Sequence, residues 1–380
     1  MRNEDLDAVI IVQSADLYYF TGTIQTGALY IPATGQPLYL VRRDHLRGRM
    51  ESGLREVMPF ASMSEIPKIL AEYDYTVPNR VGMEFDVLPV AVFERYKKVF
   101  PSATFKDASE LIRRTRMIKS HYEIHLMQDA ANQVDKVFRV AAEILKEGMT
   151  DVELAAELER VARLAGHPGL IRMRVFNGEM LFGHTFSGAD SAVPAYTDTP
   201  LGGLGVTPSF GQGASYKRIE RNEPIIMDFA GSCDGYLVDQ TRIMAIGGLS
   251  PKLVKGYEDM LAIQELMKRL APQLPSWGEL YDECLALAVS MGYSDSFMGM
   301  KGSQVSFIGH GIGIEIDEYP FIARGFHKMK LEPGMAFAFE PKLVFPGEGA
   351  IGIENSFYLA DDGALKQLTF SDEKIMFLPV

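Results

Sequence analysis

The sequence has few cysteines and no long hydrophobic run. Its 380 residues include 2 cysteines, Cys233 and Cys284, which are too few for a disulfide framework and are typical of a reducing compartment. The apolar run at residues 8–12 is too short for a secretory signal peptide, and no stretch approaches the roughly 18 apolar residues of a membrane helix. These shortages predict a soluble, cytoplasmic protein that does not span a membrane.

Basic residues are also scarce relative to acidic ones. The chain has 38 Lys and Arg against 50 Asp and Glu, a net charge of −12. Because binding to phosphates needs a basic face, this balance argues against a nucleic-acid partner. It leaves open a cluster of carboxylates held together by metal cations. At 47% hydrophobic residues, a chain of this length can bury a large core.

The chain divides into two predicted domains of the α/β (α+β) class. Residues 1–115 alternate short apolar runs with helical patterns, which indicates an α/β unit with its own core. The basic segment 113–119 is predicted to be a linker from its composition, the alternative being a solvated helix end. A Ser-x-x-Glu capping box at residues 120–123 then begins the second domain, residues 120–380.

Two aspartates lie on a predicted β-hairpin. Apolar residues flank Asp234-Gly235, a two-residue turn suited to a type I′ hairpin. With the turn there, Asp239 pairs with Ala230, and side chains alternate between the two faces of each strand. Asp228 and Asp239 are then diagonal neighbours on one face, about 7–8 Å apart at the backbone. Two carboxylates at this separation are suited to sharing a metal ion.

A second predicted hairpin carries two glutamates. A turn centred on Gly347 places Glu340 directly opposite Glu354. Each glutamate lies in an otherwise apolar strand, where an unpaired carboxylate costs several kcal/mol unless it is paired or ligated. For any one acid, a solvent-facing position on an edge strand is the more common explanation. Four acids on two hairpins favour a shared site.

A histidine in a glycine-rich loop completes the candidate site. His310 lies within the segment Gly309-His-Gly-Ile-Gly313, whose glycines allow close approach of the backbone. A single histidine is more often a core residue than a ligand. Together with four carboxylates, however, a neutral imidazole suits hard or borderline ions such as Mn²⁺, Co²⁺ or Zn²⁺. Two divalent ions would neutralise the four carboxylates, so the residues predict a dinuclear hydrolase site.

These motifs resemble those of the pita-bread metallopeptidases, the family of aminopeptidase P, prolidase, methionine aminopeptidase and creatinase. The segment Asp239-Gln-Thr-Arg242 resembles the family's Asp-x-Thr-Arg, and His310, Glu340-Pro341 and Glu354 follow in the family's order. Residues 15–22 are similar to the N-terminal domain of the prolidase, aminopeptidase P and creatinase branch. The resemblance implies a creatinase-like N-terminal domain followed by a pita-bread catalytic domain.

The resemblance also implies a role for each candidate ligand. Asp228 would chelate one metal ion, His310 and Glu340 would bind the other, and Asp239 and Glu354 would bridge both. A hydroxide between the ions would be the nucleophile, and Glu340 would also shuttle its proton as a catalytic residue. The implied cofactors are two divalent ions, Mn²⁺ first and Co²⁺ or Zn²⁺ as alternatives. Creatinase chemistry does not need these ligands, so creatinase activity itself is disfavoured.

Four positions depart from the family pattern. Three family histidines and one family arginine, which serve the substrate side, are replaced by Ala195, Ser306, Asp317 and Gly352. His184 is a candidate for a replacement catalytic imidazole, the alternative being a structural loop histidine. Asp317, as a substrate-binding residue, would make the pocket more anionic and would suit a cationic or neutral substrate.

The sequence therefore predicts a hydrolase of the Xaa-Pro peptidase type, which cleaves an amide bond in a dipeptide or short peptide. A first alternative is a non-peptidase enzyme on the same scaffold that acts on a small amide, amidine or cyclic amide, as the missing histidines favour. A second is a metal-stabilised, non-catalytic binding protein, which retention of all five ligands disfavours. The resemblance further suggests a homodimer.

Overall fold

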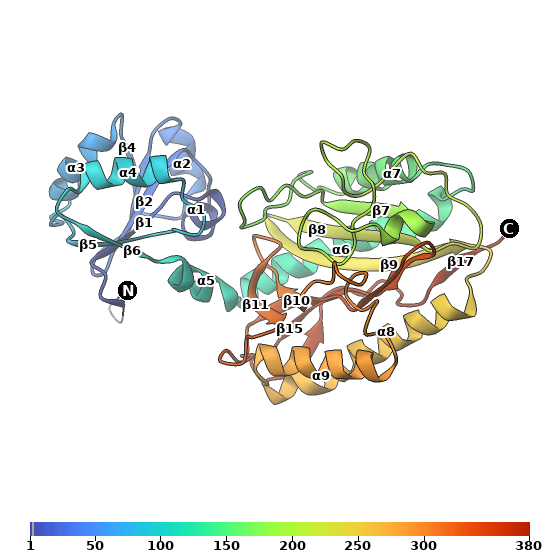
Figure 1. Ribbon diagram of the computed structural model, residues 1–380. Helices are drawn as coiled ribbons and strands as arrows, with labels where there is room; N and C mark the ends of the chain where they lie inside the picture. Colours follow the sequence, from blue (N-terminus) through green and yellow to red (C-terminus); the bar gives the residue numbers. More distant parts are fainter. Residues whose placement is uncertain (2–3) are drawn as a thin grey trace. The chain divides into compact units, whose positions relative to one another are not determined.

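The computed structural model describes residue 1 and residues 4–380. The chain forms two compact units (Figure 1). Unit 1 comprises Met1–Arg116 and Arg174–Asn177, and unit 2 comprises Met117–Met173 and Gly178–Val380. The main division between the units lies between Arg116 and Met117. The predicted domain limits, residues 1–115 and 120–380, stay predictions.

Unit 1 is built on a six-stranded mixed sheet in the order β4-β3-β2-β1-β5-β6. Alternate residues of β1 enter different apolar clusters, Ala8 and Ile10 on one side and Val9 and Ile11 on the other. Both faces of the sheet are thus covered, which explains why this strand reads as a continuous apolar run. Its elements are β1 (Ala8–Ile11), α1 (Ser14–Thr21), β2 (Gly27–Pro32), β3 (Leu38–Val41), α2 (His45–Glu51), β4 (Glu56–Pro59), α3 (Ile66–Glu72), β5 (Arg80–Met83), α4 (Val90–Val99), β6 (Thr104–Asp107) and α5 (Ser109–Met117).

The segment predicted to be a linker, residues 113–119, contains the division between the two units, but most of it is helical. Residues 113–117 belong to α5, and Arg116 is buried, with its Nη1 atom 2.6 Å from Oδ1 of Asp16. Basic composition suggested exposure, but a buried carboxylate from another part of unit 1 supplies the charge partner that lets this arginine enter the interior.

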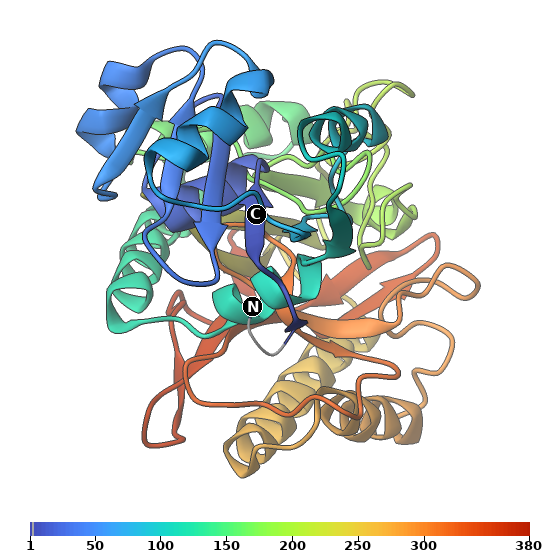
Figure 2. The same cartoon turned by 90° about the vertical axis from the view of Figure 1, so that its left-hand side faces the viewer.

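Unit 2 places several sheets between two pairs of helices. In Figures 1 and 2, α6 and α7 lie on one outer side of the sheets and α8 and α9 on the other. The strand orders are β17-β9-β8-β7, β11-β10-β12-β15-β16 and β13-β14. The helices are α6 (His121–Ile144), α7 (Asp151–Leu164), α8 (Pro251–Leu270) and α9 (Trp277–Ser290). The strands are β7 (Gly183–Ser187), β8 (Ile225–Cys233), β9 (Tyr236–Ile246), β10 (Phe307–Gly311), β11 (Glu318–Ala323), β12 (Ala336–Phe339), β13 (Lys342–Phe345), β14 (Gly349–Gly352), β15 (Asn355–Leu359), β16 (Leu365–Gln367) and β17 (Met376–Leu378).

The predicted capping box at the start of unit 2 is confirmed. The Ser120 hydroxyl accepts a hydrogen bond from the Glu123 backbone N–H, and the Glu123 carboxylate accepts one from the Ser120 N–H. The helix that follows packs along β8 and β9, the strands that carry the two candidate aspartates. Capping therefore fixes where the helix beneath the candidate site begins.

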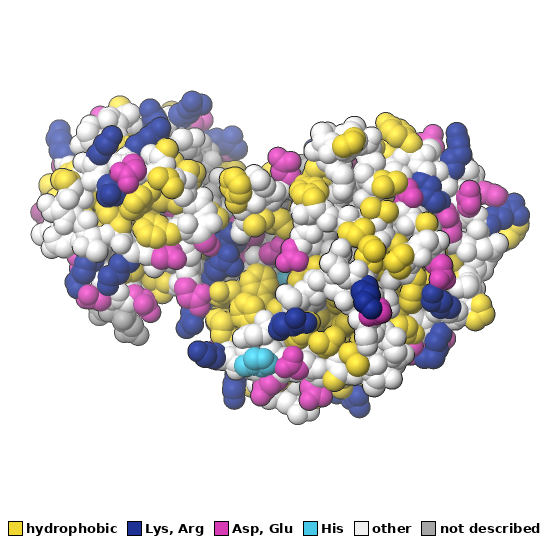
Figure 3. Space-filling model, in the orientation of Figure 1, with side chains coloured by type: hydrophobic (Ala, Val, Ile, Leu, Met, Phe, Trp, Pro, Cys, Tyr) yellow, Lys and Arg dark blue, Asp and Glu magenta, His cyan; other side chains and the backbone are white. Residues whose placement is uncertain are grey.

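Among the described residues, no helix has the length and apolar character needed to cross a bilayer. On the face shown in Figure 3, acidic and basic side chains are interspersed over both units.

Candidate metal centre

The first hairpin has the predicted register. Asp234 and Gly235 both have positive φ, 46° and 81°, as a type I′ turn requires. Ala230 pairs with Asp239, so Asp228 and Asp239 lie diagonally on one face of β8 and β9. The predicted neighbourhood of these two carboxylates is confirmed at the level of strand pairing.

The second hairpin is interrupted where its glutamates lie. β12 pairs with β15, and β13 pairs with β14, in a single continuous register. Between the two ladders comes Glu340-Pro341, and the proline has no N–H to donate. Glu354 forms an isolated bridge with Thr241 of β9 instead of a ladder pair with Glu340. This bridge, together with a hydrogen bond of 2.8 Å from the Thr241 hydroxyl to Oε2 of Glu354, joins the second hairpin to the first.

His310 on β10 presents its Nε2 atom to the glutamates. Its Nδ1 atom lies 2.6 Å from the carbonyl oxygen of Ile316. Because a carbonyl oxygen can only accept, Nδ1 carries a hydrogen and donates a hydrogen bond to it. Nε2 is left facing Oε1 of Glu340 at 3.7 Å and Oε1 of Glu354 at 3.8 Å. A backbone acceptor that fixes the tautomer in this way is typical of a metal-binding histidine.

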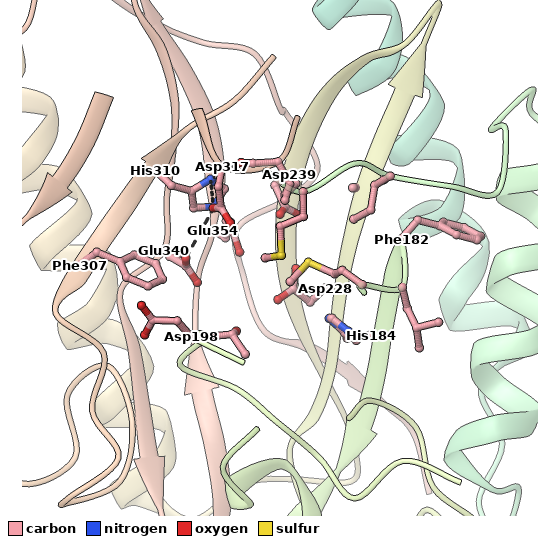
Figure 4. Close-up of a pocket in the computed structure, with 17 residues that line it drawn as sticks. Phe182, His184, Asp198, Asp228, Asp239, Phe307, His310, Asp317, Glu340 and Glu354 are labelled. Carbon is pink, nitrogen blue, oxygen red and sulfur yellow. Dashed lines mark hydrogen bonds and ion pairs between the residues drawn. The ribbon is translucent and has the colours of Figure 1, made fainter. Parts of the chain in front are cut away.

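Three of the five predicted ligands lie close enough to bind one ion. Ligand atoms of Asp239, His310 and Glu354 all lie within 4.8 Å of one another. Figure 4 shows His310, Glu340 and Glu354 on one side of a pocket and Asp228 and Asp239 on the other. Two carboxylates and one imidazole fit a single divalent cation, because such ions accept mixed oxygen and nitrogen ligands.

A buried lysine, which the sequence analysis did not identify, contacts the other side of the cluster. The Nζ atom of Lys342 lies 2.7 Å from Oε2 of Glu340, 2.7 Å from Oε2 of Glu354 and 3.2 Å from Oδ2 of Asp228. Its side chain is only 2% exposed. The ammonium thus binds three of the five predicted ligands at once.

The cluster shifts the pKa values of its members in different directions. Burial raises the pKa of Glu340 to about 7, against the opposing charge of Lys342. Burial also acts to raise the pKa of Glu354, but Lys342 and His310 outweigh it and lower that pKa to about 2. Burial and the neighbouring carboxylates raise the pKa of Asp239 well above its ordinary value. Glu340 is therefore one carboxyl of the cluster suited to exchange a proton near neutral pH.

His184 and Asp317 both line the pocket. His184 on β7 pairs with Asp228 in the sheet, and its Nε2 atom is buried and has no hydrogen-bond partner among the described residues. Burial lowers the pKa of His184 to about 4, so its imidazole is neutral at physiological pH. Asp317 approaches His310 from the far side, with Oδ1 3.5 Å from Nδ1. The catalytic role of His184 and the substrate-binding role of Asp317 stay predictions.

Sequence reasoning missed several residues at the site, among them three with polar or aromatic side chains beside the predicted ligands. Asp198 and Phe307 line the same pocket, and Lys342 binds its carboxylates. Asp198 lies in a loop without a recognisable motif. The one available signal for Lys342 was its position two residues after Glu340 in an apolar strand, where a lysine needs a buried partner.

Two known domain families match the chain. The Creatinase/Prolidase N-terminal domain matches residues 1–118, and metallopeptidase family M24 matches residues 125–361. The fold is thus a creatinase-type N-terminal domain followed by a pita-bread catalytic domain, as predicted.

Individual relatives span nearly the whole chain. An Xaa-Pro dipeptidase of Pyrococcus furiosus is 28% identical over 378 residues, which cover 99% of this chain and 97% of that protein. The crystal structure of the prolidase from Pyrococcus horikoshii OT3 is 25% identical with a TM-score of 0.82, covering 99% of this chain and 97% of the other. An X-Pro aminopeptidase from Thermotoga maritima, 23% identical with a TM-score of 0.81 and full coverage of both chains, shares the fold. With the family matching well over half of its residues, the chain belongs to metallopeptidase family M24.

Proposed function

We propose that the chain is a metal-dependent peptidase of the Xaa-Pro dipeptidase type, which hydrolyses an amide bond in a dipeptide or short peptide. The cluster of Asp239, His310 and Glu354 carries this proposal, because these groups converge on one ion beside an open pocket. The full-length similarity to an Xaa-Pro dipeptidase supports the substrate class. Mn²⁺ is the proposed ion, with Co²⁺ or Zn²⁺ as alternatives.

The protein groups around the ion have separable roles in this proposal. A divalent cation bound there would supply Lewis acidity and would lower the pKa of water. Glu340, whose carboxylate lies 3.7 Å from Nε2 of His310, would accept a proton from water and return it to the leaving nitrogen. His184, whose Nε2 has no hydrogen-bond partner among the residues that the structure describes, would contact the substrate from the pocket wall, to which Asp317 would contribute negative charge. Homodimer formation and a cytoplasmic location stay predictions.

A second candidate function is hydrolysis of a small amide, amidine or cyclic amide that is not a peptide. The replacement of substrate-side groups by Ala195, Ser306 and Gly352 favours it, since these residues offer no imidazole or guanidinium to a peptide. Turnover of a substrate panel separates the two candidates. A preference for an acidic leaving group would contradict the role assigned to Asp317.

Replacing Asp239 or Glu354 with alanine tests the site directly. We expect each variant to lose metal binding and turnover together, because each removes one of three converging ligands. Metal content is measured after gel filtration, and turnover is measured on Xaa-Pro dipeptides and on amides without proline. The control is Asp361→Ala, which removes an exposed acid whose partner is His121. Full activity in either test variant would contradict the assignment. A metal-loaded wild type that is inactive on every amide would favour a binding protein.

A further inference from the structure

The ammonium of Lys342 lies among the carboxylates that a second metal ion would need. In the sequence-based assignment, Asp228 binds the ion that His310 and Glu340 do not bind. Its Oδ2 atom contacts Nζ of Lys342 at 3.2 Å. The same nitrogen donates a hydrogen bond to Oε2 of Glu354, whereas the other oxygen of that carboxylate, Oε1, faces His310. An ion bonded to these oxygens would compete with the ammonium for both of them.

The distances between ligand atoms also separate Asp228 from the residues that converge on one ion. Among the described residues, the group of acids, histidines and cysteines whose atoms converge within 4.8 Å consists of Asp239, His310 and Glu354. Asp228 is absent from that group, and Lys342 binds it instead. Glu340 reaches both sides, with Oε2 on Lys342 and Oε1 facing His310. The cluster thus has one set of ligand atoms that converge on a single position, and beside it the ammonium of Lys342.

The backbone around Lys342 is adapted to its side chain. Lys342 pairs with Gly352 across β13 and β14. A Cβ atom at position 352 would lie 2.7 Å from Cγ of Lys342 and 2.6 Å from the carbonyl oxygen of Pro341. Neither separation is tolerated between non-bonded heavy atoms, so a larger residue at 352 would have to shift the backbone of residues 341–342 together with the lysine stem. Gly352 therefore permits the close approach of the strand that carries Lys342.

Charge is compatible with a single ion. Four carboxylates, one ammonium and one divalent cation leave a net charge of −1, so the ammonium supplies part of the positive charge that a second cation would otherwise bring. A second divalent cation would have to bind close to that ammonium, which repels it.

We propose that this chain binds one divalent ion, at Asp239, His310 and Glu354, and that the ammonium of Lys342 takes the place of the second cation beside Asp228. The inference rests on the proposed function, because it requires that the cluster binds a metal ion. It departs from the sequence-based prediction of two ions. Lys342 is a positioning residue in this arrangement, because it holds Asp228, Glu340 and Glu354 around the single ion.

Metal stoichiometry tests the inference on the full-length protein. Chelator-treated wild type is titrated with Mn²⁺ by calorimetry, and bound metal is counted after gel filtration. We expect one ion per chain in the wild type and two in Lys342→Ala, a doubling of stoichiometry. Lys342→Arg keeps the cation and should stay at one. The control Lys217→Met removes a partly buried lysine that lies 2.6 Å from Glu223, and it should also stay at one.

Two further measurements keep the test independent of one variant's folding. Electron paramagnetic resonance of wild type saturated with Mn²⁺ should show the hyperfine signal of an isolated ion and no exchange-coupled pair. Lys342→Met, which keeps most of the side-chain stem and removes the ammonium, should admit a second ion. Two ions in the wild type, or one in a folded Lys342→Ala, would overturn the inference and leave the proposed peptidase intact. No bound ion in the wild type would overturn the proposed function itself.

Discussion

At the scale of single residues, the predicted ligands were recognisable because their types and spacing are unusual. A carboxylate in an apolar strand is costly, so Asp239, Glu340 and Glu354 stood out. Lys342 did not, because a lysine beside a proline resembles an ordinary strand end. Two of its three carboxylate partners, Asp228 and Glu354, are distant in sequence. Apart from the nearby Glu340, its partners therefore depend on tertiary contacts that no local pattern reveals.

His184 provides a prediction at this scale. Its Nε2 atom is buried in the pocket and has no partner among the described residues, so His184→Gln should lower kcat/KM by about 10-fold, the value of one lost hydrogen bond to the substrate. Metal content and thermal stability should stay unchanged. His167 is a matched control, because its Nε2 is equally unpartnered among the residues described and its ring stacks on Phe182. Equal losses in His184→Gln and His167→Gln would indicate a structural role.

At the scale of elements, the turn residues largely determined the registers that could be predicted. Asp234-Gly235 set the pairing of β8 and β9, and a turn at Gly347 set that of β13 and β14. The break at Pro341 and the bridge from Glu354 to Thr241 were not predicted, because they require contact between separate hairpins. The helical part of residues 113–119 and the burial of Arg116 were not predicted for a related reason, since composition does not reveal a buried ion pair.

Gly235→Ala tests the link between this register and the metal site. Gly235 has a φ of 81°, and alanine in that region costs about 1–2 kcal/mol. We expect a loss of stability of that size in chemical denaturation and weaker Mn²⁺ binding, because Asp228 and Asp239 flank the turn. Gly248→Ala is the control: its backbone is not left-handed, and an added Cβ would meet nothing within 4 Å. If Gly235→Ala lost stability but bound metal normally, the turn would not position the ligands.

At the scale of the whole molecule, unit 1 is not one continuous stretch of chain. Residues Arg174–Asn177 belong to it, although the residues on either side of them belong to unit 2. The guanidinium of Arg174 is buried, with its Nη1 atom 2.6 Å from Oδ2 of Asp16 and its Nε atom 2.7 Å from Oδ2 of Asp86. Sequence patterns could not reveal this, because the segment has no periodicity of its own.

Arg174→Met should therefore destabilise unit 1. Removing one partner from a buried ion network costs about 3–5 kcal/mol, and we expect a loss of this order in denaturant unfolding at pH 7. Burial acts to raise the pKa of Asp86, but Arg174 outweighs it and holds that pKa below 3.8. The stabilisation through Asp86 is then present above that pH and lost as pH falls through the lowered pKa.

The matched control is Arg221→Met, which breaks a half-exposed pair with Glu147 and should cost at most about 1 kcal/mol. Equal losses in the two variants, or a difference between Arg174→Met and wild type that persists unchanged in strong acid, would contradict the role of the network.

The discontinuity of unit 1 has a consequence for biosynthesis. The ribosome adds Arg174 roughly 60 residues after Arg116, and at about 5–20 residues per second this delay lasts several seconds. During that interval Arg116 is present to neutralise Asp16, but the arginine that pairs with both Asp16 and Asp86 has not been made. Most of unit 1 is translated first, yet the ion pairs of Arg174 with Asp16 and Asp86 can form only after α6 and α7 have been synthesised.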